Sequence, residues 1–219
     1  MQDEIFVIIP AYNEAARIGA VLEGVKKYCP NIIVVDDGSD DETSEVAKWY
    51  KVIVLRHKVN LGKGAALKTG CEAALKLGAK ILVFMDADGQ HEPKGIPRLV
   101  KAIYKGYDLV IGMRRLNRRM PFSMWVGNKI FSKLIHYFYN FNLPDTQCGF
   151  RALRVSVYPK IQWMAQGYEV ETEMLLSALR GKLRCAAIPI QAIYYDSYKG
   201  TTIIDGFKIL AKIIERRIF

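Results

Sequence analysis

The run from Ile81 to Met85 constrains the fold most, because it reads ILVFM between Lys80 and Asp86. A run of 5 apolar residues is too short for a buried helix. A strand that is buried on both faces shows this kind of continuous apolar pattern, and such strands occur mainly in parallel sheets covered by helices. The run therefore predicts a central strand of an α/β sheet.

Strand and helix patterns alternate through the first 113 residues. The other predicted strands are Ile5 to Ile9 with Pro10 as its end, Ile32 to Val35, Val52 to Leu55 and Leu109 to Met113. The predicted helices are about Ala15 to Tyr28, Glu42 to Trp49, Gly64 to Leu77, and one that ends near Lys105. This alternation is typical of a mostly parallel, doubly wound sheet.

Oxygen-bearing side chains follow the central strand at alternate positions: Asp86, Asp88 and Gln90. Open α/β sheets bind their ligands at the carboxyl ends of strands. Two carboxylates and an amide are hard ligands, which suit Mg²⁺ or Mn²⁺ rather than zinc, and substrate phosphates usually complete the shell of Mg²⁺. These residues predict a metal site for a phosphorylated ligand. A plain turn is the other interpretation, because Asp and Gly are common in turns.

The loops after the other strands carry further candidates: Tyr12 and Glu14 after the first, Asp37 after the second and Lys63 after the third. In a doubly wound sheet these loops meet at one edge, beside the acidic pair. An aromatic ring there can stack on a base, and carboxylates can accept from ribose hydroxyls or from the base. Taken singly, such residues more often cap helices or form turns.

The glycines exclude two nucleotide-binding folds. A dinucleotide fingerprint needs Gly-x-Gly-x-x-Gly after the first strand, but that turn has no glycine, and Gly62 and Gly64 are followed by Leu67 where a third glycine is needed. The P-loop pattern Gly-x-x-x-x-Gly-Lys-Ser/Thr does not occur either. Dehydrogenases and P-loop NTPases are therefore excluded.

Composition limits the partners and the compartment. The chain has 219 residues, enough for one well-cored domain, and 32 Lys and Arg against 22 Asp and Glu give a net charge of +10. This charge predicts an anionic partner, which can be nucleic acid, a membrane surface or a phosphorylated substrate. No signal peptide is apparent, and no apolar run reaches the roughly 18 residues of a spanning helix. The 4 cysteines have no paired spacing, which favours reduced thiols in the cytosol over a zinc site.

Motifs along the chain resemble those of a known family. They are VIIPAYNEAARI, VVDDGSDDET, NLGKGAALKTG, FMDADGQHEP, a Gly-x-Arg at Gly112 to Arg114, and DTQCGFRAL at Asp145 to Leu153. In this order they resemble the GT-A glycosyltransferases of family 2, and among them the dolichyl- and polyprenyl-phosphate sugar synthases. The resemblance covers about residues 4 to 200. It implies a Rossmann-like, mostly parallel sheet flanked by helices.

The resemblance also implies residue roles. The nucleoside of a GDP- or UDP-sugar is expected on Pro10, Tyr12, Glu14, Asp37 and Asp86, with Lys63 nearby. The metal on the donor diphosphate, Mg²⁺ or Mn²⁺, is expected on Asp86, Asp88 and Gln90. Asp86, Asp88 and Arg114 are the expected catalytic residues, and Arg114 is expected to face the acceptor phosphate.

Further acceptor-site candidates are Arg114, Arg118, Arg119, Asp145, Gln147, Arg151 and Lys199. Relatives carry an arginine shortly before the Gly-Asn of the next helix, where this chain has Met124 and Trp125. Arg118 or Arg119 can replace that arginine or can form a basic loop facing lipid headgroups. Arg151 is expected to pair with Asp145 or with the glutamates of YEVETEM, and a structural ion pair is as plausible as a catalytic one.

Two amphipathic segments are expected to form interfacial helices, Phe122 to Phe141 and Ile203 to Phe219. Ordinary helices packed on the core are the alternative. The expected division is a single domain with a nucleotide-sugar half at 1–115, an acceptor half at 116–202 and a C-terminal amphipathic helix at 203–219. Many relatives continue past the second segment into membrane-spanning segments, whereas this sequence ends at Phe219, so we expect the chain to be peripheral on the cytoplasmic face or to use a membrane-spanning partner.

The function that follows is a metal-dependent, inverting transfer of a hexose from GDP-mannose or UDP-glucose to a polyprenyl or dolichyl phosphate. One alternative is a family 2 transferase with a soluble or protein acceptor. Another is a catalytically silent, membrane-associated nucleotide-binding subunit, against which the intact acidic motif argues. A nucleic-acid-binding domain is suggested by charge alone; the chain has no motif of that class, so we expect no nucleic-acid partner.

Overall fold

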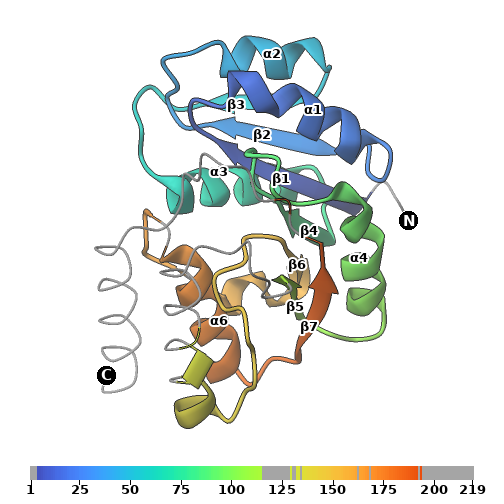
Figure 1. The fold of residues 1–219 in the computed structure, drawn as a ribbon, viewed down its shortest axis with the longest axis vertical. Helices are drawn as coiled ribbons and strands as arrows, with labels where there is room; N and C mark the ends of the chain where they lie inside the picture. Colours follow the sequence, from blue (N-terminus) through green and yellow to red (C-terminus); the bar gives the residue numbers. More distant parts are fainter. Residues whose placement is uncertain are drawn as a thin grey trace.

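A seven-stranded sheet forms the centre of the molecule (Figure 1). The computed structural model describes residues 4–114, 129, 132–133, 135–161, 163–167, 169–191 and 193. The strands are β1 Ile5–Ala11, β2 Ile32–Asp36, β3 Ile53–Arg56, β4 Ile81–Phe84, β5 Leu109–Arg114, β6 Arg151–Arg154 and β7 Cys185–Ile190. Their order is β3-β2-β1-β4-β6-β5-β7, and β6 alone among them runs antiparallel to its neighbours. The predicted mostly parallel sheet is confirmed.

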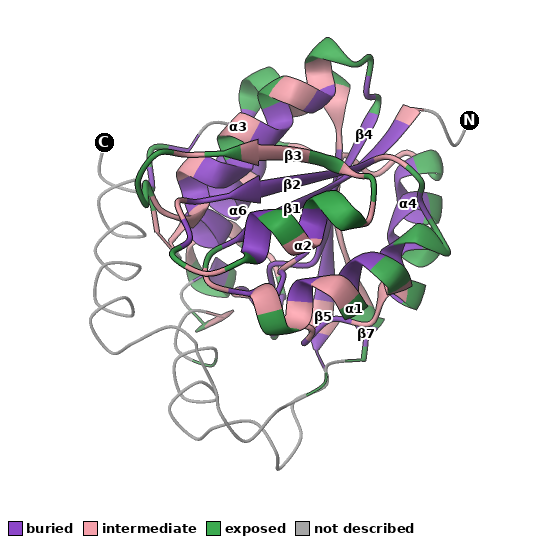
Figure 2. Cartoon of the chain, turned by 90° about the horizontal axis from the view of Figure 1, so that it is seen from above, coloured by how far each residue is buried: buried purple, intermediate pink, exposed green. Residues whose placement is uncertain are grey.

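Helices cover both faces of this sheet. The α-helices described in full are α1 Ala15–Lys26, α2 Thr43–Trp49, α3 Lys63–Lys76, α4 Ile96–Tyr104 and α6 Val170–Arg180, with short 3-10 helices η2 Pro93–Gly95 and η3 Val155–Lys160. Figures 1 and 2 show α1 and α4 on one face and α3 and α6 on the other. Every residue of β1, β2 and β4 is buried as a result (Figure 2). The continuous apolar runs of these strands follow from burial on both sides.

The first strand is longer than its sequence predicts. We expected Pro10 to end it, but β1 continues to Ala11, and Pro10 lies in register with Val35 of β2. Proline removes an N–H donor, which would break a ladder in the middle of a sheet. Side chains and backbone groups alternate along a strand, so the missing N–H of Pro10 faces the β4 side, where pairing with β1 ends at Ile8 and Phe84. The proline therefore removes no bond to β2.

The strand β6 has no counterpart in the sequence prediction. It is short, reads Arg-Ala-Leu-Arg, and lies antiparallel between β4 and β5. An isolated apolar pair between two arginines carries neither strand periodicity nor a continuous apolar run. Its place in the sheet is set by pairing with two buried strands rather than by local pattern.

The two halves of the chain join at the N-terminus of α3. The backbone N–H of Gly64 donates to Gln166 O at 2.6 Å, and the indole Nε1 of Trp163 donates to Gly64 O at 2.9 Å. A Cβ atom on Gly64 would lie 1.9 Å from Ala165 O. Only glycine permits the backbones to approach this closely.

Helix α6 holds the same loop from its other side. One carboxylate oxygen of Glu173, Oε2, accepts from the backbone N–H groups of Met164 at 2.7 Å and Ala165 at 3.1 Å. Glu173 is fully buried, so these hydrogen bonds form away from water. The first turn of α6 therefore fixes the loop that contacts α3.

The predicted amphipathic segments lie largely outside the described residues. Of Phe122 to Phe141, the described positions 129, 132–133 and 135–139 are helical, and Ile135 is fully buried whereas Tyr137 is 81% exposed. The segment Ile203 to Phe219 lies wholly outside. In the part of the chain that the structure describes, none of the helices has the length and apolarity to cross a membrane.

We predict that Gly64→Ala lowers the free energy of unfolding by about 2 kcal/mol or more, because the new methyl group forces the α3 junction apart. Urea unfolding measures the change. Lys68→Ala, an exposed position of the same helix, serves as the control and should change stability by less than about 0.5 kcal/mol. Equal stability of the two variants would contradict the close backbone contact.

Candidate active site

A cavity of about 500 Å³ opens at the edge of the sheet where the parallel strands end. The strand order places the side chains along this edge in a fixed sequence: Asp37 beyond β2, Tyr12 beyond β1, Asp86 and Asp88 beyond β4, and Arg114 at the end of β5. The other predicted residues that line the cavity are Pro10, Glu14, Lys63, Gln90 and Gln147. The sheet therefore gathers residues from both halves of the chain.

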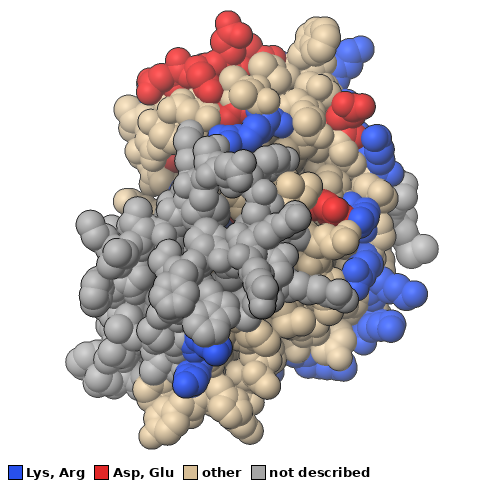
Figure 3. Space-filling view, viewed as in Figure 1, with Lys and Arg blue, Asp and Glu red and all other residues tan. Residues whose placement is uncertain are grey.

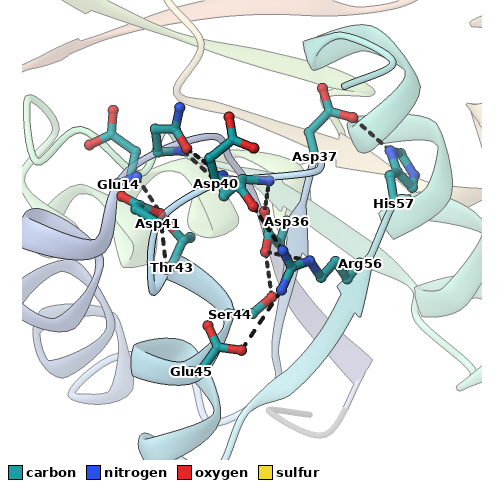
Figure 4. A network of polar contacts seen from close by, with 12 residues as sticks. Glu14, Asp36, Asp37, Asp40, Asp41, Thr43, Ser44, Glu45, Arg56 and His57 are labelled. Carbon is teal, nitrogen blue, oxygen red and sulfur yellow. Dashed lines mark hydrogen bonds and ion pairs between the residues drawn. The ribbon is translucent and has the colours of Figure 1, made fainter. Parts of the chain in front are cut away.

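Asp37 is held by three donors, of which Figure 4 shows His57, and it still lines the cavity. Its Oδ1 lies 2.6 Å from His57 Nδ1 and accepts from Leu61 N at 3.0 Å, while Oδ2 accepts from Gly62 N at 2.7 Å. The other ring nitrogen of His57 lies 2.9 Å from Thr69 Oγ1. His57 therefore orients Asp37, a role that no sequence motif indicated.

The neighbouring Asp36 has a structural role. It is fully buried, accepts from Ser39 N at 2.9 Å and from the hydroxyl of Ser44, and lies 3.5 Å from Arg56 Nε. Figure 4 shows it pointing away from Asp37. Of the two adjacent aspartates, Asp37 alone lines the cavity.

Side-chain contacts also fix the loop that carries Tyr12 and Glu14. Asp41 accepts from the backbone N–H groups of Ala15 and Thr43, each at 3.0 Å, so it caps the first turns of α1 and α2 together. The carboxylate of Glu14 lies 2.5 Å from Arg17 Nε. The ring of Tyr12 is 43% exposed and available for stacking.

Lys63 lies between two carboxylates from different elements. Its Nζ is 2.5 Å from Asp86 Oδ1 and 2.7 Å from Glu171 Oε1 of α6. Burial alone lowers the pKa of Lys63, but the charges of Asp86 and Glu171 outweigh burial and raise it above its usual value. Burial opposes ionisation of Asp86 as well, and Lys63 nevertheless holds its pKa below the usual range. Lys63 and Asp86 are therefore both charged near neutral pH.

Asp88 is ionised less readily than Asp86. Burial and the negative charge of Asp86 raise the pKa of Asp88 to about 6, although its Oδ1 accepts from Gln90 N at 2.9 Å. Asp88 forms no ion pair with the residues that the structure describes, and a carboxylate placed in this way beside a second carboxylate is expected to bind protons or metal ions.

His91 and Cys148 lie buried behind the acidic pair. His91 Nε2 is 3.7 Å from Cys148 Sγ, and its Nδ1 is 3.8 Å from Asp86 Oδ2. Burial lowers the pKa of His91 to about 4 and raises that of Cys148 to about 12. Both groups are neutral at pH 7, so the Cys-His-Asp sequence of contacts does not form a thiolate nucleophile.

The residues at the end of β4 fit a hard divalent cation. Asp86, Asp88 and Gln90 offer oxygen donors to one cavity. Within the described ranges, no three His, Cys, Asp or Glu side chains converge as a metal site. Two carboxylates and an amide suit Mg²⁺ or Mn²⁺ with ligand phosphates in its shell, as the sequence predicts.

Arg114 reaches the cavity from β5 and is held by Asp145. Its Nε and one terminal nitrogen donate to the two oxygens of Asp145 at 2.7 and 2.9 Å, and its backbone N–H donates to Oδ2 at 3.1 Å. Asp145 is fully buried and does not line the cavity. The bidentate pair fixes the plane of the guanidinium.

The predicted ion pair of Arg151 is wrong. Its guanidinium donates to three backbone carbonyl oxygens, those of Cys148 at 2.8 Å, Thr146 at 2.8 Å and Glu171 at 2.6 Å. Arg151 is 1% exposed and does not line the cavity. Its guanidinium instead connects the turn before β6 to the first turn of α6.

The remaining acceptor candidates divide into two groups. Gln147 lines the cavity and donates to Thr172 Oγ1 at 2.8 Å. Arg118, Arg119 and Lys199 lie outside the described residues, so their roles stay predictions.

The cysteines are free thiols in the structure, without disulfides: Cys29, Cys71 and Cys148 are buried and Cys185 is partly buried.

Asp145→Ala should destabilise the protein by about 3 to 5 kcal/mol, because it leaves the buried charge of Arg114 without its partner. Replacing both residues, Arg114→Met with Asp145→Leu, should recover much of this loss. Denaturant unfolding measures both variants. A loss below about 1 kcal/mol for the single variant would contradict the structural role of the pair.

Asp88→Asn should stabilise the metal-free protein at pH 7 by about 2 kcal/mol. The raised pKa of Asp88 means that its contribution to stability is present at low pH and is lost as pH rises from about 4 to about 6. The gain should therefore vanish near pH 4. Urea unfolding in a metal chelator at both pH values tests this, with the exposed Asp40→Asn as control. A gain that is the same at both pH values would refute the shift.

These features define an α/β protein with a polar cleft at the end of its parallel strands, where such folds bind their ligands. Residues 6–162 match the family described as glycosyl transferase family 2, and the chain belongs to this family. It is a glycosyltransferase, as the sequence predicts.

Relatives and solved structures agree with this membership. The chain is 35% identical to the UDP-N-acetylglucosamine–dolichyl-phosphate N-acetylglucosaminyltransferase of Methanococcus voltae, over 96% of this chain and 94% of the relative. It is 33% identical to the polyprenol monophosphomannose synthase of Mycolicibacterium smegmatis, over 84% of this chain and 75% of the relative. Glucosyl-3-phosphoglycerate synthase from Mycobacterium tuberculosis shares the fold, with a TM-score of 0.79, 22% identity and coverage of 98% and 80%. The predicted GT-A fold is confirmed.

Proposed function

We propose that the chain transfers a hexose from a nucleotide sugar to a polyprenyl phosphate at a membrane surface. The observation that supports this most is the order of side chains along the sheet edge. Tyr12 and Asp37 suit a nucleoside, Asp86 and Asp88 suit a metal-bound diphosphate, and Arg114 suits a second phosphate. A donor and a phosphate acceptor laid along this edge would meet between β4 and β5.

The nucleoside end is built to accept hydrogen bonds. Asp37 is fixed by His57 and presents a carboxylate, so it would accept from a base edge or a ribose hydroxyl. Tyr12 would stack on the base, and Pro10 and Glu14 would line the same part of the cavity. The donor would be GDP-mannose, UDP-glucose or a related sugar nucleotide.

The diphosphate would lie at the end of β4. Asp86, Asp88 and Gln90 would hold Mg²⁺ or Mn²⁺ there, which as a Lewis acid stabilises the charge on the leaving phosphate oxygen. Lys63 adds a second cation at the same place. Its ammonium would stay charged throughout, because the two carboxylates raise its pKa.

The acceptor needs no protein base. A phosphate monoester has a second pKa near 6, so one of its oxygens is already an anionic nucleophile at neutral pH. This oxygen would bond to the anomeric carbon as the bond from that carbon to the nucleoside diphosphate breaks, which inverts the configuration. Arg114, held in plane by Asp145, would position the acceptor phosphate. Arg118, Arg119, Gln147 and Lys199 are further candidates on this side.

The names of the relatives support a lipid phosphate as acceptor. The Methanococcus voltae relative is named for dolichyl phosphate, and the Mycolicibacterium smegmatis relative is named as a polyprenol monophosphomannose synthase. Both are at least 33% identical to this chain and align over at least 84% of it. A polyprenyl phosphate also accounts for the anionic partner that the net charge of +10 predicts.

The charge distribution favours one orientation on an anionic bilayer. Figure 3 shows acidic side chains gathered at one end of the molecule, over α2, where Asp40, Glu42 and Glu45 are exposed. An anionic surface repels this end. The predicted amphipathic segments would then meet the cytoplasmic face of the membrane, alone or with a membrane-spanning partner.

The test is transfer of labelled sugar from a panel of GDP- and UDP-sugars to short polyprenyl phosphates, with Mg²⁺ or Mn²⁺. We expect organic-extractable product from one donor, and a loss of at least about 100-fold in Asp88→Ala. Glu45→Gln, an exposed change of the same charge, should keep full activity. Donor hydrolysis without lipid product would favour a soluble acceptor instead, and nucleotide binding without any reaction would favour a silent subunit.

A further inference from the structure

Glu171 is a buried carboxylate on the cavity wall that the sequence did not single out as a ligand residue. It lies in the first turn of α6 and is 4% exposed. Its Oε1 is 2.7 Å from Lys63 Nζ. Its Oε2 is buried and has no hydrogen-bond donor among the residues that the structure describes.

A carboxylate oxygen without a donor is costly in a buried position. A structural role for Glu171 accounts for Oε1, which pairs with Lys63, but leaves Oε2 unexplained. Because the residue lines the cavity, a bound ligand can supply the missing donor. The unsatisfied oxygen is therefore in a position to accept a hydrogen bond from a ligand bound in the cavity.

The charges around Glu171 limit the kind of donor. The ammonium of Lys63 already fills the space between Glu171 and Asp86. A phosphate oxygen carries no proton to donate at neutral pH and is repelled by a carboxylate. A neutral hydroxyl satisfies Oε2 without adding charge.

The position of Glu171 limits which part of the donor it meets. Its backbone carbonyl accepts from Arg151 of β6, the strand on the far side of β4 from β1 and β2. The nucleoside is proposed to lie over β1 and β2, and the diphosphate at β4. In a donor laid along the sheet edge in the order nucleoside, diphosphate and sugar, Glu171 therefore lies beside the sugar.

We infer that Glu171 binds a hydroxyl of the transferred sugar through Oε2, while Lys63 holds Oε1 and spans from the sugar subsite to the diphosphate. This inference rests on the proposed function. It makes Glu171 a specificity-determining residue for the donor, distinct from the residues that bind the nucleoside and the metal.

The test compares two ligands, a sugar nucleotide and its nucleoside diphosphate, by calorimetry with Mn²⁺. The pairs are GDP-mannose with GDP, and UDP-glucose or UDP-N-acetylglucosamine with UDP, and the pair that binds the native chain most tightly is used. Glu171→Gln and Glu171→Ala should weaken binding of the sugar nucleotide by about 10-fold or more, because glutamine offers only a neutral acceptor in place of the carboxylate and alanine removes the hydrogen bond altogether. The affinity for the nucleoside diphosphate should stay within about 3-fold or improve, because a negative charge near the diphosphate is removed.

Glu169→Gln is the matched control, since it removes the same charge at the start of the same helix but does not line the cavity. It should leave both affinities unchanged. A sugar nucleotide that lacks the contacted hydroxyl should bind the native chain and Glu171→Gln equally well. This second comparison identifies the hydroxyl, and it does not require Glu171→Ala to fold.

Three outcomes overturn the inference. Equal weakening of both ligands in Glu171→Gln means that the residue only holds Lys63. No weakening of either means that Oε2 has no ligand. Failure of the native chain to bind any nucleotide of the panel overturns the proposed function together with this inference, whereas the first two outcomes leave the proposed function intact.

Discussion

The charge of Lys63 is the constraint on which the cavity depends. Asp37, Asp86, Asp88 and Glu171 all line one cavity, and their mutual repulsion would oppose folding. Lys63 bridges two of these carboxylates, from β4 and α6, at 2.5 and 2.7 Å. Lys63 lies at the start of α3, next to Gly64, whose backbone contacts the loop before α6. The contact that joins the two halves of the chain therefore also positions the ammonium group that balances the charge of the cavity.

This arrangement leaves part of the site unbalanced. Asp86 forms an ion pair with Lys63, but Asp88 forms none within the described part of the chain, and its pKa rises to about 6. An energetically unfavourable carboxylate at a ligand edge is a common compromise between stability and function. The same reasoning applies to Glu171, whose Oε2 is buried without a donor in the described structure. Both defects are relieved by what the cavity is proposed to bind.

The sequence predicts the sheet well because its central strands are continuous apolar runs bounded by polar loops. It also predicts which loops line the cavity, since parallel strands carry their ligands at their carboxyl ends. It does not predict partners that are distant in the chain. Asp145 binds Arg114 from 31 residues away, and Trp163 binds Gly64 from 99 residues away, and neither contact has a local signature. The predicted ion pair of Arg151 is wrong for the same reason, because buried arginines can be satisfied by carbonyls as well as by carboxylates.

The cavity is lined by the loops that follow the parallel strands and also by the turn that precedes β6. The antiparallel direction of β6 explains this difference. In the parallel strands the chain leaves the sheet at the cavity edge, so the following loops carry the ligand residues. In β6 the direction is reversed, and Phe84 of β4 pairs with Arg151, the first residue of β6. The turn that precedes β6 therefore lies at the cavity edge and brings Gln147 and Gly149 into the cavity lining. Arg151 closes this turn through its three carbonyl contacts, so it holds Gln147 and Gly149 at the cavity edge without lining the cavity itself.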